Sequence, residues 1–269
     1  MKLAGVISLK EIQFGPIIFR GRFDESIAKL AQLGYEGVEI SLRDPHNVDI
    51  ESMHGILKKH RISLASIATG PSALMEGLSF TDINRNVRDA AIARIMRHID
   101  LASQFSAQVI IGGMKGNLPE GKQANEARKW AVEAFQKVAE YAESKSTIIL
   151  METINRYEMN WLNTVSEGIE FIRQINRDNV ALHVDTFHMN IEEPSPSESI
   201  LQAGSQIGYV HLADSNRWAP GYGHIDFSET IDCLRKIGYS GYLSFEVLPL
   251  PDPDSAAAMG LKTIHRLLT

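Results

Sequence analysis

Residues 147–185 read TIILMETINRYEMNWLNTVSEGIEFIRQINRDNVALHVD. This stretch begins with a short apolar run at 147–153 and ends with a second one at 179–185. Between the two runs, residues 164–175 place apolar side chains at the i, i+3, i+4 and i+7 spacing of a helix with one buried face. The order of strand, helix and strand predicts a βαβ unit, whose two strands lie parallel in one sheet.

The same alternation extends over the whole chain. Apolar runs rich in Val, Ile and Leu predict eight strands, at 2–8, 37–42, 63–69, 107–113, 147–153, 179–185, 207–213 and 241–247. Eight strands alternating with helices predict an α/β protein, a parallel (β/α)8 TIM barrel that forms a single domain over residues 1–269. The competing fold, an open doubly wound sheet, needs a glycine-rich phosphate-binding turn after the first strand, and GVISLKEIQFG at 5–15 is not one.

Composition disfavours several classes of function. The formal net charge is −6 and no long basic run occurs, so we expect no nucleic-acid partner, because such a partner requires a basic surface. The single cysteine, Cys233, excludes an internal disulfide and a thiolate zinc cage. No apolar stretch approaches the ~20 residues of a membrane span, and MKLAGVISLKEIQ lacks the regions of a signal peptide, so we expect a cytoplasmic protein.

Ionisable residues close four consecutive predicted strands: Glu152, Asp185, His211 and Glu246. In a barrel of this kind, the strand ends carry the chemistry. Three carboxylates gathered there would raise one another's pKa values unless a cation lay between them. One imidazole with three carboxylates is a harder donor set than zinc prefers, so the sequence predicts Mn²⁺, with Mg²⁺ or Co²⁺ as alternatives. The other explanation is four unrelated residues, each neutralised by a helix N-terminus or a salt bridge.

Side chains suited to a polyhydroxylated ligand follow these strand ends. Glu158, His188 and Arg217 can donate to or accept from sugar hydroxyls, although solvated loops or helix capping would also explain them. His183 lies two residues before Asp185 and shares its inward face. It is either a supporting partner of the metal site or a buried core histidine.

Four motifs in the C-terminal half carry a resemblance to a known family: METINRYE (151–158), HVDTFHMNIEEPS (183–195), HLADSNRWAPGYGHIDF (211–227) and GYLSFE (241–246). Together they resemble the D-tagatose 3-epimerase and D-psicose (allulose) 3-epimerase family of the xylose-isomerase-like TIM barrel superfamily. That resemblance implies an isomerase that inverts the carbon next to the carbonyl of a ketose through an enediolate. It also implies a homodimer or homotetramer.

The resemblance assigns roles to the residues already singled out. It implies metal ligands at Glu152, Asp185, His211 and Glu246, and substrate contacts at Glu158, His188 and Arg217. Glu152 and Glu246 would form an acid/base pair, in which one carboxylate removes a proton and the other returns one from the opposite face. A bound divalent ion would stabilise the enediolate.

The N-terminal half departs from the family pattern. SLKEIQFGPIIFRGRF (8–23) and GGMKGNLPEG (112–121) lack the tryptophan that free-ketose members place beside the sugar. Phe14 and Phe19 are candidates for an apolar wall there, with core packing as the alternative. Arg43 and Lys115 are extra cations expected at the barrel mouth, where they would bind a carboxylate or phosphate. The expected substrate is therefore a ketose or a keto sugar acid.

Two other activities remain open from the residues alone. An aldose-ketose isomerase or a hydroxypyruvate-type isomerase uses related metal-carboxylate sites but moves the carbonyl group. An apurinic-site endonuclease-like phosphodiesterase would share the barrel, but its multi-zinc site needs more histidines than these strand ends provide, and the acidic charge opposes binding to DNA.

Overall fold

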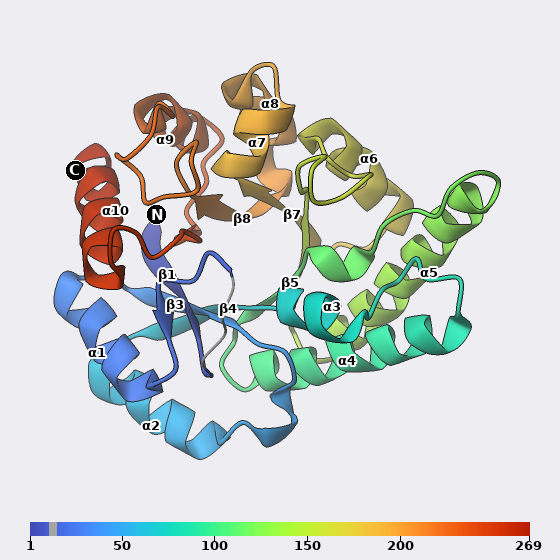
Figure 1. Ribbon diagram of the computed structural model, residues 1–269, viewed down its shortest axis with the longest axis horizontal. Coiled ribbons are helices and arrows are strands. Elements are labelled where there is room, and N and C mark those ends of the chain that lie inside the picture. Colours follow the sequence, from blue (N-terminus) through green and yellow to red (C-terminus); the bar gives the residue numbers. More distant parts are fainter. Residues whose placement is uncertain (11–14) are drawn as a thin grey trace.

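The computed structural model describes residues 1–10 and 15–269, and its centre is a closed barrel of parallel strands (Figure 1). The first and last strands of the barrel pair from Lys2 opposite Tyr242 to Gly5 opposite Phe245, and this pairing closes it. The barrel strands are β1 (Lys2–Ser8), β3 (Gly37–Ser41), β4 (Ser63–Ala68), β5 (Gln108–Ile111), β6 (Ile149–Glu152), β7 (Val180–Asp185), β8 (Ile207–Leu212) and β9 (Tyr242–Phe245). The predicted (β/α)8 barrel is confirmed.

Helices surround the strands in chain order (Figure 1). The helices between successive barrel strands, together with the last helix, are α1 (Phe23–Leu33), α2 (Ile50–His60), α4 (Arg85–Ser103), α5 (Gln123–Ser144), α6 (Val165–Ile175), α8 (Pro196–Ala203), α9 (Phe227–Lys236) and α10 (Pro253–Leu268). Each buries one apolar face against the strands, as the helical spacing predicts. None of the described helices is both long and apolar enough to cross a lipid bilayer.

Three short elements were not expected from the sequence: β2 (Phe19–Arg20), α3 (Gly70–Glu76) and α7 (Thr186–Glu192). β2 pairs with the carboxyl end of β1, whereas α3 and α7 directly follow β4 and β7. Several strands are also shorter than predicted. β9 ends at Phe245, so Glu246 lies one residue beyond the strand.

The barrel interior contains two kinds of side chain. Small and medium apolar groups fill one part around Tyr209: Ala4, Ala65, Ala68, Ile110 and Leu150. Several other strand positions are polar although they are buried, as at Glu39, Ser66, His183 and Ser244. Because an unpaired buried polar group is costly, these positions indicate a role in binding or chemistry.

Candidate metal centre and active site

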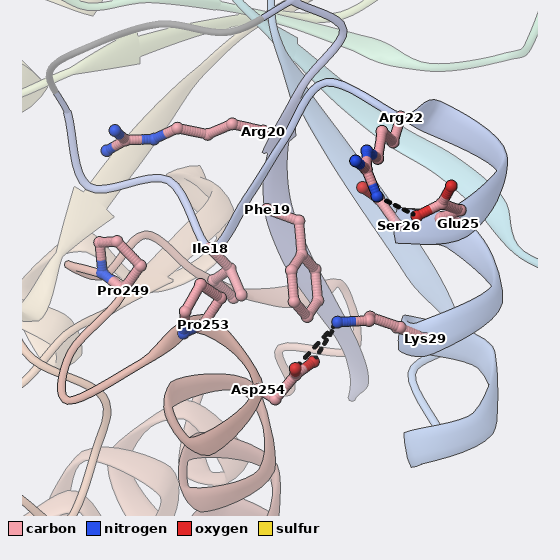
Figure 2. A pocket seen from close by; sticks show the side chains of 10 residues that line it. All are labelled: Ile18, Phe19, Arg20, Arg22, Glu25, Ser26, Lys29, Pro249, Pro253 and Asp254. Carbon is pink, nitrogen blue, oxygen red and sulfur yellow. Dashed lines mark hydrogen bonds and ion pairs between the residues drawn. The ribbon is translucent and has the colours of Figure 1, made fainter.

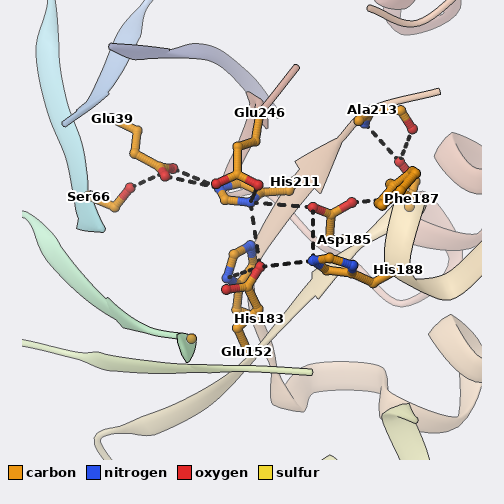
Figure 3. Close-up of polar contacts among 12 residues, drawn as sticks. Glu39, Ser66, Glu152, His183, Asp185, Phe187, His188, His211, Ala213 and Glu246 are labelled. Carbon is orange, nitrogen blue, oxygen red and sulfur yellow. Dashed lines mark hydrogen bonds and ion pairs between the residues drawn. The ribbon is translucent and has the colours of Figure 1, made fainter. Parts of the chain in front are cut away.

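The side chains that close the last four barrel strands meet at one point (Figure 3). Glu152 and Asp185 are the final residues of β6 and β7, His211 is in β8, and Glu246 follows β9. The strand register brings them together, because Asp185 pairs with His211 across β7 and β8. One ligand atom from each of the four residues lies within 4.8 Å of those of the other three.

Glu39 of β3 orients the imidazole of His211. The His211 Nε2 atom lies 2.9 Å and 3.1 Å from the two carboxylate oxygens of Glu39, and the Ser66 hydroxyl donates to Glu39 at 3.0 Å (Figure 3). A proton on Nε2 leaves the lone pair of Nδ1 free to bind a metal ion. Glu39 was not expected from the sequence, although an acidic residue within the apolar run GVEIS was a usable signal.

The His211 Nδ1 atom faces all three carboxylates. It lies 3.5 Å from Glu246, 3.7 Å from Asp185 and 3.8 Å from Glu152, and it has no hydrogen-bond partner among the described residues. Burial opposes protonation of His211, but the carboxylates of Glu39 and Glu246 outweigh it and hold the imidazole pKa above its usual range. A buried nitrogen beside three carboxylates therefore fits a divalent cation, which would take the place of the proton.

The carboxylates themselves have opposite electrostatic surroundings. Burial, reinforced by the charge of Glu246, raises the pKa of Glu152 to about 8. Burial alone would raise the pKa of Asp185. The positive charge of the Arg217 guanidinium outweighs this effect and holds the pKa of Asp185 below its usual range. Arg217 donates to Asp185 Oδ2 at 2.6 Å and pairs with Glu246. Without a further cation, the site thus favours a proton on Glu152 and a charge on Asp185.

The three residues expected to contact a sugar lie around this cluster. His188 Nε2 is 3.9 Å from Glu152 Oε1, and Asn155 links His188 to Glu158 through contacts of 2.7 Å and 2.9 Å. Burial lowers the pKa of His188 to about 3, so its imidazole is neutral and both donates and accepts hydrogen bonds. Arg217 completes the group through its contacts with Asp185.

Lys115 is fully buried rather than exposed at the barrel mouth. It ends the short 3₁₀ helix Gly113–Lys115 after β5, and its ammonium group donates to the Gly112 carbonyl at 3.4 Å. Burial lowers the pKa of Lys115 to about 8, partly offset by the charges of Glu152 and Glu158. Its positive charge therefore acts on the same space as those two carboxylates.

The other N-terminal candidates have partners of their own. Arg43 is exposed, and its Nε atom lies 3.5 Å from Glu76 of α3. Phe19 is buried in the hydrophobic core and borders a cleft of about 380 Å³, beside the ion pair between Lys29 and Asp254 (Figure 2). Core packing thus accounts for Phe19. Phe14 lies outside the described residues.

Residues 27–265 match the protein-family model described as "Xylose isomerase-like TIM barrel". The chain belongs to this family. An L-ribulose 3-epimerase from Methylomonas sp. (strain DH-1) is 34% identical over 229 residues, which cover 82% of this chain and 77% of that protein. A ketose 3-epimerase from Arthrobacter globiformis is 30% identical over 256 residues, which cover 91% of this chain and 86% of that protein.

Solved structures of the family agree with these relatives. The structure of a D-allulose 3-epimerase from Methylomonas sp. in complex with D-allulose matches this chain with a TM-score of 0.82 and 27% identity, over 98% of this chain and 97% of that chain. The resemblance to the ketose 3-epimerases is therefore confirmed. This member of the xylose isomerase-like family is a carbohydrate epimerase, an enzyme of the isomerase class.

Proposed function

We propose that this protein is a divalent-metal-dependent ketose 3-epimerase, which inverts the carbon next to the carbonyl group of its sugar. One observation carries the proposal: carboxylate oxygens of Glu152 and Glu246, from separate strands, lie 3.8 Å and 3.5 Å from the same imidazole nitrogen of His211. Two carboxylates beside one cation-binding point are what an inversion needs, because the proton leaves one face and another returns to the opposite face.

The ion would be held by Glu152, Asp185, His211 and Glu246, with Mn²⁺ as the expected metal and Mg²⁺ or Co²⁺ as alternatives. When bound, it supplies positive charge that stabilises the negative charge developing on the sugar oxygens. Glu39 keeps Nδ1 of His211 turned towards the three carboxylates that would hold the ion, and Arg217 balances the charges of Asp185 and Glu246.

The proton steps belong to the two glutamates. One carboxylate removes the proton from the sugar carbon, which leaves the electron pair in an enediolate, and the other glutamate then gives its own proton to the opposite face of that carbon. Glu158 and the neutral imidazole of His188 would bind the hydroxyl groups around the carbonyl end of the sugar.

The relatives support a ketose without a charge, since one is named for L-ribulose and the matched structure contains D-allulose. The buried ammonium group of Lys115 favours a second candidate, a keto sugar acid whose carboxylate would pair with it. Turnover rates of a keto-aldonate, fructose and psicose would decide between the two substrate classes. They would be measured for wild type, Arg43→Ala and Lys115→Met. A preference for the uncharged sugar that neither substitution changes would exclude the acid.

The decisive test is NMR analysis of products formed in D₂O by metal-stripped protein supplied with Mn²⁺ and a panel of ketoses. We expect the 3-epimer, with deuterium at C3, and no turnover by Glu152→Gln or Glu246→Gln. An aldose product would instead identify an isomerase that moves the carbonyl. Turnover that is independent of added metal would contradict the proposal.

A further inference from the structure

The imidazole of His183 is buried in the barrel interior. Its side chain is completely inaccessible to solvent, and neither ring nitrogen has a hydrogen-bond partner among the described residues. Packing alone does not require a histidine here, because an apolar side chain would fill the space without the cost of burying two unpaired nitrogens. A bound ligand would supply the partner that the ring nitrogens of His183 lack.

His183 points into the candidate site (Figure 3). Its Nδ1 atom lies 3.9 Å from Glu152 Oε1, and its ring lies at 89° to the ring of His211, with the centroids 4.1 Å apart. Three potential ligand atoms, one each from Glu152, His183 and His211, lie within 4.8 Å of one another. These three residues form a second donor set that shares Glu152 and His211 with the first.

The two donor sets differ in their chemistry. The first combines one imidazole with three carboxylates, whereas the second combines two imidazoles with one carboxylate. Oxygen-rich sets suit Mn²⁺ and Mg²⁺. Two histidines and one glutamate, with a fourth position left for water, make up a known kind of zinc site. The two donor sets therefore offer Mn²⁺ and Zn²⁺ different positions beside the same residue, His211.

We propose that Glu152, His183 and His211 form a second metal position, selective for Zn²⁺, that overlaps the four-residue set and cannot be filled together with it. The lone pair of His211 Nδ1 binds only one ion at a time, and two divalent ions so close would also repel each other. Zn²⁺ at this position occupies Glu152 and so inhibits the enzyme. The inhibition rests on the proposed epimerase function, whereas the zinc binding does not.

The test measures two metals on three forms of the full-length, metal-stripped protein: wild type, His183→Gln and Asp185→Asn. Zn²⁺ affinity comes from competition with a zinc-binding dye, and Mn²⁺ affinity from the electron paramagnetic resonance signal of the free ion. We expect His183→Gln to weaken Zn²⁺ binding by at least about tenfold, with Mn²⁺ binding close to wild type. Asp185→Asn should instead weaken Mn²⁺ binding and leave Zn²⁺ binding close to wild type, because Asp185 belongs only to the four-residue set.

X-ray absorption at the zinc edge counts the imidazole ligands directly, in the wild type and in the variants. Two imidazoles around the bound Zn²⁺ are expected, and one in His183→Gln or His183→Leu, with thermal unfolding of each variant as the folding control. A single imidazole in the wild type overturns the proposal, as does a loss of both metals in parallel in a folded His183 variant. Zinc binding as expected in a protein without epimerase activity would contradict the proposed function and leave this inference standing.

Discussion

Glu39 is the residue on which the orientation of His211 depends. Its carboxylate contacts His211 Nε2 and is itself held by Ser66, so it fixes which nitrogen faces the cluster. Such a partner acts on the metal through the ligand it orients, and its loss weakens binding without removing a ligand.

We expect Glu39→Gln to reduce Mn²⁺ affinity about 10- to 100-fold, because the amide supports the protonated Nε2 less strongly than the carboxylate does. Isothermal titration calorimetry on the metal-stripped protein would measure the change. Glu36→Gln is the matched control, because Glu36 is exposed and its carboxylate accepts a hydrogen bond from the backbone amide of Leu3, away from the cluster. Equal affinities of Glu39→Gln and wild type would exclude an orienting role for Glu39.

The Glu152 carboxyl predicts how pH changes the stability of the metal-free protein. Its pKa is about 8 in the folded protein and its usual 4.5 in the unfolded chain, so the folded state binds more protons between these values and the free energy of unfolding falls as pH rises. The lowered pKa of His188, about 3 against the usual 6.5, gives the opposite slope below pH 6.5. Between pH 6.5 and 8 the fall dominates, and Glu152 alone contributes up to about 1.4 kcal/mol per pH unit.

Urea unfolding in the presence of a chelator, at several pH values across this interval, would measure the slope. The raised pKa of His211 acts in the same direction, so Glu152→Gln should flatten the decrease rather than abolish it. A free energy of unfolding that rises across the interval in the wild type would show that Glu152 is already ionised there.

At the scale of elements, the end of β5 determines how closely the backbone approaches Glu152. A Cβ atom on Gly112 would lie 2.2 Å from Glu152 Oε2, whereas one on the next residue, Gly113, would lie 3.5 Å from the side chain of Ala73, an ordinary contact. The turn that follows the strand therefore leaves room for the carboxylate only because residue 112 lacks a side chain.

We expect Gly112→Ala to displace the Glu152 carboxylate, lowering both Mn²⁺ affinity and kcat by at least about tenfold, because small misplacements of catalytic groups are costly. Gly113→Ala should leave both close to wild type. Steady-state kinetics with a turned-over ketose, together with Mn²⁺ titration of both variants, would test this. Equal effects of the two substitutions would mean that the backbone after β5 shifts to accommodate the new side chain and that Glu152 does not move.

The elements also show what the sequence predicts well. The long helices and the barrel strands follow from apolar periodicity, and the four residues that close β6 to β9 follow from their position after apolar runs. α3 and α7 are too short, at seven residues each, to show a helical period. The contact of Glu39 with His211, the burial of Lys115 and the pairing of Arg43 with Glu76 depend on packing between distant segments, which no local pattern reveals.

For the whole molecule, we expect metal binding and folding to be coupled. The four-residue donor set exists only when β6 to β9 are in register, so an ion that binds it stabilises the folded state. The gain follows from mass action and is about 2.7 kcal/mol when the free ion is at a hundred times its dissociation constant.

We therefore expect Mn²⁺ to raise the melting temperature of the metal-stripped protein, and a chelator to reverse the increase. Differential scanning calorimetry with Mn²⁺, Mg²⁺ and Co²⁺ would rank the ions by their shifts. Asp185→Asn is the control, and its shift should be smaller for each ion. A shift of equal size in wild type and variant would place the stabilising ion elsewhere on the protein.

The hydrogen bond between Glu39 and His211 joins positions 172 residues apart, on strands that are not neighbours in the barrel. All four donors of the larger set come from the second half of the chain, yet the first half supplies the group that aligns one of them. A version of the protein cut into two separate halves should thus recover strong ion binding only after the pieces reassemble.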